Sequence, residues 1–129
     1  MDKVKVSDKL LLSVEKPARY TGGELNSIVK ETARLRFALC FPDVYEIGMS
    51  HLGSRILYEV INSREEYACE RCFAPWPDME KAMRENNVPM FTLETRTPLA
   101  ECDIVGFSLL YEMCYTNILT MLDLAHIHK

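Results

Sequence analysis

The chain has 129 residues, of which 48% are hydrophobic and 26% are charged, which is the composition of one soluble globular domain. Its formal net charge of -4 argues against nucleic acid as the main partner, because contact with a phosphate backbone requires a cationic surface. The apolar runs are too short to span a membrane, and the first residues lack the apolar segment of a signal peptide. We therefore expect a cytoplasmic protein with no membrane partner.

The polar residues 1–33 are predicted to form an N-terminal extension of the main domain, which we place at residues 34–129. Within the extension, Ser7 is suited to cap a short apolar helix that ends at Pro17. Two adjacent glycines then mark a turn before the main domain begins.

Four segments of the main domain have the apolar patterns of β-strands, at residues 34–41, 67–73, 88–93 and 103–110. The first begins with alternation and ends as a continuous apolar run, and the last is again such a run, as is typical of buried parallel strands. Helical spacing and capping residues predict helices at residues 50–63, 78–87, 98–101 and 115–125, the third of them a single turn. Strands and helices therefore alternate along the chain.

This alternation predicts an α/β domain with a Rossmann-like (flavodoxin-like), mostly parallel sheet and helices on both faces. The expected strand order is 3-2-1-4, numbered in sequence order. A doubly wound sheet usually has about five or six strands, so the domain is expected to be incomplete at its C-terminal end. The unpaired sheet edge that results would favour self-association.

Ligands of open parallel sheets bind at the carboxyl ends of the strands, next to the switch in strand order. The loops after the first and fourth strands would lie side by side there and form one crevice. The candidate cofactor-binding residues of these loops are Asp43, Tyr45, Glu46, Gly48, Met49, Ser50, Ser108, Leu110, Tyr111 and Glu112.

The loop at residues 43–50 lacks the three-glycine spacing of a dinucleotide fingerprint and the lysine of a phosphate-binding loop. Asp43 and Ser50 can serve as helix caps, and Gly48 can supply a turn with positive φ. Free N–H groups at the start of the following helix would equally suit an anion. The residues alone leave both interpretations open.

Residues 42–50 (Pro-Asp-Val-Tyr-Glu-Ile-Gly-Met-Ser) and 106–112 (Gly-Phe-Ser-Leu-Leu-Tyr-Glu), with a lead-in at 15–20, resemble a known family. They are similar to the N-terminal domain of cobalamin-dependent radical S-adenosylmethionine (radical SAM) proteins. The resemblance implies an accessory or cofactor-presenting domain whose partner is the radical SAM barrel, where a [4Fe–4S] cluster and S-adenosylmethionine act. The Cys-x-x-x-Cys-x-x-Cys triad that holds such a cluster is absent, so we expect no catalysis by this chain alone.

Cobalamin domains carry Asp-x-His-x-x-Gly and then Ser-x-Leu, and this resemblance implies cobalamin as a cofactor. The chain keeps Asp43, Gly48, Ser108 and Leu110, but Tyr45 stands in place of the histidine that binds cobalt. A phenol is a poor metal ligand at neutral pH, so bound cobalamin would have no protein ligand from this loop.

Three readings of the domain remain open. It binds cobalamin in this His-off manner, or it has lost the cofactor and acts only as a lid or protein-interaction module, with Tyr45 packed inward on Tyr111. A free-standing flavodoxin-like nucleotide binder is disfavoured, because a phosphate-binding loop is missing.

The five cysteines are odd in number and lie in apolar runs, so we expect reduced, buried thiols. Cys69 and Cys72 have the spacing of a zinc or redox pair, but a second pair for zinc is missing. Because both lie on a predicted strand, three positions apart, they are expected to point to opposite faces of the sheet. Trp76, between two prolines, is expected to anchor the core or a domain contact.

Overall fold

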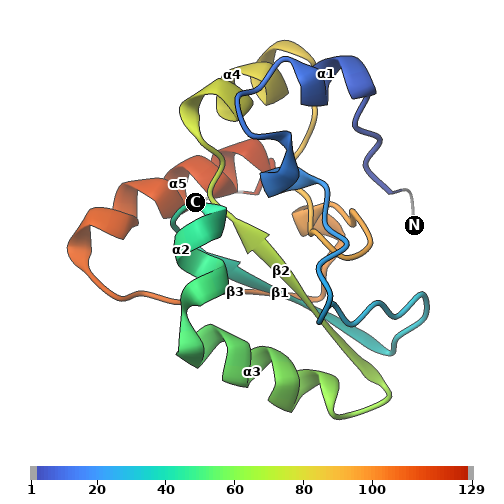
Figure 1. Cartoon of the computed structure of the whole chain (residues 1–129). Helices are drawn as coiled ribbons and strands as arrows, with labels where there is room; N and C mark the ends of the chain where they lie inside the picture. The colour runs from blue at the N-terminus through green and yellow to red at the C-terminus, as the bar shows by residue number, and fades with distance from the viewer. Residues whose placement is uncertain (1–2, 128–129) are drawn as a thin grey trace.

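A computed structural model describes residues 3–127 and shows a three-stranded, fully parallel sheet in the order β2-β1-β3. The strands are β1 (Leu35–Phe41), β2 (Tyr67–Phe73) and β3 (Ile104–Phe107). With helices on both faces (Figure 1), this confirms the predicted Rossmann-like α/β class. The described residues leave out residues 1–2 of the predicted extension (1–33) and residues 128–129 of the predicted main domain (34–129).

Within the described residues, five α-helices surround the sheet: α1 (Asp8–Leu12), α2 (Tyr45–Ser50), α3 (Leu52–Asn62), α4 (Pro77–Glu85) and α5 (Tyr115–Leu124). Three short 3₁₀ turns are η1 (Pro17–Tyr20), η2 (Leu99–Glu101) and η3 (Glu112–Cys114). Figure 1 shows α1, α4 and α5 on one side of the sheet and α3 on the other, with α2 next to the carboxyl ends of the strands. The predicted turn at 98–101 and the last helix are confirmed.

The larger apolar core lies between the sheet and the helices α1, α4 and α5. Its fully buried members include Cys40 of β1, Met79 of α4 and Met121 of α5. The N-terminal residues contribute to the same core through Val4 and Leu10. Residues 3–33 therefore pack against the α/β layer, and their burial adds to its hydrophobic stabilisation.

A smaller core lies under α3 and contains Leu39, Tyr58 and Cys69. Cys72, on the same strand as Cys69, belongs to the larger core instead. The two thiols thus point to opposite faces of the sheet, as their spacing predicts. All five cysteines are free, and burial raises the pKa of Cys69 to about 12, which makes it a structural thiol rather than a nucleophile.

The predicted strand at residues 88–93 is wrong. This segment runs beside β2, as the expected strand order requires, and the Leu93 N–H donates to the Arg71 carbonyl over 2.9 Å. The Arg71 N–H, however, donates to the Glu94 carboxylate over 2.9 Å rather than to a backbone carbonyl. A side chain therefore takes the place of a ladder bond, and the segment makes only an isolated bridge between Phe91 and Pro98.

Several predicted boundaries also differ. The helix capped by Ser7 is confirmed, but it ends at Leu12, and Pro17 begins the turn η1 instead of ending the helix. Proline fixes φ near the helical value, so Pro17 suits the first position of a turn as well as the end of a helix.

The fourth predicted strand ends at Phe107, before the exposed Leu110.

A buried polar cluster fixes the 92–97 segment to the sheet. Glu70 of β2 is fully buried, and its carboxylate pairs with Arg36 of β1. The hydroxyls of Thr92 and Thr95 donate to the same carboxylate over 2.6 and 2.5 Å. A buried carboxylate is tolerated only with such partners, so the cluster specifies how the segment lies against the sheet.

Candidate functional site

The switch in strand order lies between β1 and β3. The chain leaves β1 for β2 on one side and returns as β3 on the other side of β1. The loops that follow β1 and β3 therefore meet, as predicted. The Tyr111 hydroxyl donates to the Asp43 carboxylate over 2.8 Å, and the Ser108 N–H donates to the Cys40 carbonyl over 3.0 Å.

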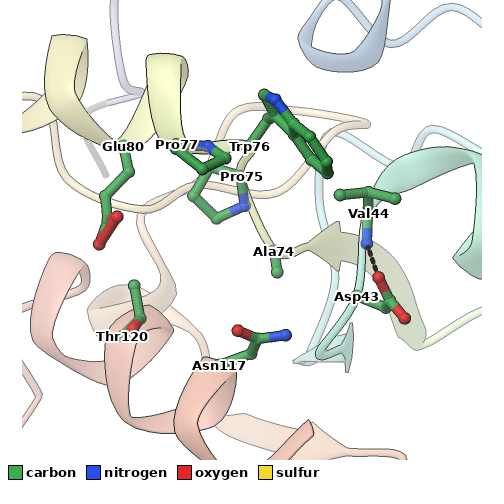
Figure 2. A pocket seen from close by; sticks show the side chains of 9 residues that line it. All are labelled: Asp43, Val44, Ala74, Pro75, Trp76, Pro77, Glu80, Asn117 and Thr120. Carbon is green, nitrogen blue, oxygen red and sulfur yellow. Dashed lines mark hydrogen bonds between the residues drawn. The ribbon is translucent and has the colours of Figure 1, made fainter. Parts of the chain in front are cut away.

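A pocket of about 270 Å³ opens at the carboxyl ends of β1 and β2, between α4 and α5 (Figure 2). It is lined by Asp43, Val44, Ala74, Pro75, Trp76, Pro77, Glu80, Asn117 and Thr120. Figure 2 shows Glu80 and Thr120 at one end of the pocket and Asp43 at the other. The Asn117 amide donates to the Pro42 carbonyl over 2.9 Å, which ties α5 to the loop after β1.

The polar groups of this pocket favour hydrogen-bond donors over anions. Asp43 and Glu80 supply carboxylates, and no lysine or arginine is among the lining residues. One Asp43 oxygen already accepts the Val44 N–H over 2.7 Å. The arrangement suits neutral amide or cationic groups and opposes phosphate by like charge.

Trp76 forms the rim of the pocket and is 44% exposed, so it does not anchor the core; the alternative, a domain contact, stays a prediction. The two flanking prolines hold the segment at the entrance to α4, where Trp76 is the N-cap residue. The Arg19 guanidinium lies 5.1 Å from the centre of the indole ring. This cation–π contact joins the N-terminal residues to the pocket rim.

Tyr45 does not lie over the crevice. Its ring packs edge-on against Phe73 with the ring centres 5.6 Å apart, whereas Tyr111 bonds to Asp43, so the expected Tyr45–Tyr111 contact is replaced by two separate ones. Burial, together with a hydrogen bond to Glu24, raises the pKa of Tyr45 to about 12. The phenol is therefore neutral at pH 7 and remains a poor metal ligand.

Gly48 has no positive φ, contrary to the turn proposed for it, and lies inside α2. A Cβ atom at this position would overlap the ring of Phe73, so the absence of a side chain permits α2 to approach the sheet closely. Ser50 is likewise not an N-cap: it is the last residue of α2, and its hydroxyl donates to the Glu46 carbonyl over 2.8 Å. His51 caps α3 instead, with Nδ1 accepting the Ser54 N–H over 3.1 Å.

The side chains of Glu46 and Met49 point to neighbours rather than into the pocket. The Arg19 Nε–H donates to Glu46 over 2.8 Å, and this hydrogen bond lowers the pKa of the Glu46 carboxyl. The Met49 sulfur lies 3.3 Å from a guanidinium nitrogen of Arg71, on the α3 side of the sheet. Of the six candidate residues in this loop, Asp43 alone lines the pocket.

The loop after β3 presents an apolar surface next to Asp43. Its exposed side chains are Leu109, Leu110, Tyr111, Met113 and Tyr115, from 44% to 81% exposed. The bond to Asp43, followed by one to Cys114, raises the pKa of Tyr111 to about 12. Glu112 begins η3 at the edge of this surface and is exposed.

Sequence analysis did not identify Glu80, Asn117 or Thr120 as site residues. Each is carried by a helix that reaches the carboxyl edge of the sheet, and helical spacing does not reveal that edge. Asn117 offered a weak signal, because a polar residue in the first turn of α5 faces the ends of the strands.

None of the helices within residues 3–127 is long and apolar enough to cross a membrane. In the same part of the chain, no three His, Cys, Asp or Glu side chains converge into a group that could hold a metal ion.

Comparison with known protein families gives a match. The family model of the radical SAM proteins, N-terminal, matches residues 53–129, which is more than half of the chain and runs from α3 to the end of the chain. No curated protein and no solved structure matches the sequence. The matched region contains β2, β3 and the helices α4 and α5, whereas β1 and the loop at residues 42–50 lie outside it. The chain belongs to the family of N-terminal domains of radical SAM proteins.

Proposed function

We propose that this accessory domain presents cobalamin to the catalytic barrel of a radical SAM enzyme. The cofactor would lie across the crevice between the loops after β1 and β3, without a ligand from the protein. The observation that carries the proposal is the contact of Asp43 with Tyr111 at the switch in strand order, beside an exposed apolar loop. Ligands of open α/β sheets bind at this position.

The residues fit an unligated corrin better than a ligated one. Tyr45 faces Phe73 and so offers no oxygen to a metal in the crevice. The pocket of about 270 Å³ is too small to enclose a corrin, because drug-sized ligands already fill about 300–1,000 Å³. The ring would instead rest on the apolar loop at 109–113, while the pocket groups Asp43 and Asn117 hydrogen-bond amides at its edge.

In this proposal the cobalt centre supplies the reactive chemistry, and the domain binds and orients it. The exposed side chains Leu110 and Met113 would exclude water from one face of the ring, and Tyr111 and Asp43 would supply a donor and an acceptor at its rim in place of their hydrogen bond to each other. Radical SAM proteins use S-adenosylmethionine and an iron–sulfur cluster. Those groups belong to the barrel, which is the partner that we propose for the exposed loop.

A second candidate is a lid or protein-interaction module that holds no cofactor. The packing of Tyr45 against Phe73 favours it, because the loop after β1 then offers no ligand to a cobalt centre. The apolar loop would then contact the barrel directly.

A titration of the purified chain with hydroxocobalamin and methylcobalamin, followed by gel filtration, tests the first proposal against the second. We expect cobalamin to coelute with the chain and to show a base-off visible spectrum without a histidine-ligated band. Leu110→Glu should abolish coelution, because it places a charge on the apolar floor. Leu12→Glu, at an 81% exposed position of α1, is the matched control and should bind as well as the unmodified chain.

Circular dichroism would establish that each variant is folded. A folded chain that never coelutes with either cobalamin would rule out the cofactor proposal and favour the lid. Coelution that survives Leu110→Glu would place the cofactor elsewhere on the domain.

A further inference from the structure

The helix α3 has the reverse of the usual polarity. Its buried residues are Ser54, Tyr58 and Asn62, each of which carries a polar group, and they face the sheet. Helices on the surface of a globular protein normally turn an apolar stripe inward and polar residues outward.

Specific hydrogen bonds hold α3 in this rotation. The Asn62 side chain accepts a hydrogen bond from the Cys69 N–H over 2.9 Å and donates one to the Cys69 carbonyl over 3.0 Å. The Tyr58 hydroxyl accepts the Ile28 N–H over 2.7 Å, and the Arg71 guanidinium lies 4.3 Å from the centre of the Tyr58 ring. Rotating α3 about its own axis would break these buried contacts, so its apolar face remains directed away from the sheet.

The outward face carries Leu52, Ile56 and Val60, four residues apart, with exposed fractions of 66%, 52% and 60%. We call these three residues the α3 stripe. Side chains four apart in sequence form one continuous row on a helix. A cavity of about 420 Å³ runs beside the row and is lined in part by Arg55 and Glu59. Contiguous exposed apolar rows with a polar rim are typical of protein interfaces.

The charges beside the α3 stripe are self-complementary. Arg55 and Glu59 each precede a stripe residue by one position, so both lie on the same flank of the row. Neither side chain forms an ion pair with another residue in the described range 3–127. In two antiparallel helices, the same flank of each helix meets, which would place Arg55 opposite the partner's Glu59 and the reverse.

We propose that the α3 stripe is the interface of a two-fold symmetric dimer, formed with a second copy of this chain in antiparallel orientation. A two-fold interface uses the same patch on both subunits, which the order of apolar and charged residues on α3 satisfies. Figure 1 shows α3 on the opposite side of the sheet from α4 and α5, the two helices that border the pocket. The dimer proposal does not rest on the proposed function.

Sedimentation equilibrium of the purified chain tests this proposal. Chain concentrations from about 5 to about 500 µM cover the dissociation constants expected of a small interface. We expect a concentration-dependent equilibrium between monomer and dimer. Ile56→Glu should weaken the dimer about a hundredfold or more, because it buries a carboxylate at the centre of the interface. Leu12→Glu, on the exposed side of α1, is the matched control and should leave the dissociation constant unchanged.

Charge reversal distinguishes the antiparallel pairing from other arrangements. Arg55→Glu and Glu59→Arg should each weaken the dimer about tenfold, since each places like charges opposite one another. The double variant R55E/E59R should restore the original dissociation constant, because it exchanges the two charges in both copies. All of these positions are exposed, so the variants should keep the circular dichroism spectrum and melting temperature of the unmodified chain.

A chain that stays monomeric to the highest concentration would overturn the proposal. A dimer that is insensitive to Ile56→Glu would also overturn it and would point to pairing through a sheet edge. The antiparallel orientation is wrong if Ile56→Glu dissociates the dimer but the double variant R55E/E59R has a dissociation constant as high as those of the single variants.

Discussion

The two faces of the sheet hold their helices in different ways. On one face, α1, α4 and α5 are anchored by apolar volume, including the fully buried methionines Met79 and Met121. On the other face, α3 packs on the smaller core and is also anchored by hydrogen bonds of Tyr58 and Asn62. The attachment of the helices on the first face depends on how well their side chains fill the space, whereas the attachment of α3 on the second depends on particular hydrogen-bond donors and acceptors. This difference explains how α3 can leave an apolar row exposed without losing its position.

The largest expected effect is on the volume-filled face. Met121→Ala removes a fully buried side chain and leaves a cavity, so we expect the free energy of unfolding to fall by about 3 kcal/mol. Urea denaturation followed by circular dichroism measures it. The matched control Met113→Ala, at an 81% exposed position, should cost less than about 0.5 kcal/mol. Equal losses in the two variants would contradict the assignment of this core.

A smaller effect is expected on the polar face. Asn62→Ala leaves the N–H and carbonyl of Cys69 without their side-chain partner, which should lower the free energy of unfolding by about 2 kcal/mol. Ser63→Ala, at the exposed end of the same helix, is the control and should change it by less than about 0.5 kcal/mol. Asn62→Leu, of similar size, tests the distinction directly. If it proves as stable as the original chain, apolar packing rather than hydrogen bonding holds α3.

The smallest effect concerns pH. Burial raises the pKa of Glu94 above its ordinary value of 4.5, although the nearby Arg71 opposes this. The folded state then holds this proton more tightly than the unfolded state does. The contribution of Glu94 to stability therefore declines as pH rises from 4.5 through the folded-state pKa.

Glu94→Gln removes this titration, so the stability of the original chain relative to the variant should decline as pH rises through that window. Urea denaturation of both proteins at a series of pH values gives the difference. A relative stability that rises with pH would mean that the Arg71 ion pair outweighs burial.

Much of the sheet was predictable, because strong local patterns specify it. β1 ends in a continuous apolar run, and apolar residues flank the charged pair of β2; the structure places both strands within one residue of the predicted bounds. The segment at 88–93 has a similar pattern, but Glu94 occupies the Arg71 N–H that a strand there would need. Whether a side chain or the backbone accepts from one N–H depends on tertiary contacts, so the local sequence pattern does not predict it.

The candidate site was predictable in position but not in composition. The meeting of the two loops follows from strand order, and the Asp43–Tyr111 bond forms there. The roles proposed for Gly48 and Ser50 were wrong, because α2 begins as early as Tyr45 and its contact with Phe73 requires a glycine. Asn117 and Thr120 enter the pocket from α5, whose placement depends on packing against α4.

The sequence by itself determined the alternation of strands and helices and the parallel sheet, because hydrophobic periodicity acts locally and crossover rules relate consecutive strands. Only the tertiary structure decided the rotation of α3. Its apolar residues recur at helical spacing and so predict a buried face, yet Asn62 and Tyr58 face the sheet. The physical reason is that buried backbone groups of Cys69 and a buried guanidinium of Arg71 require polar partners, and α3 supplies them.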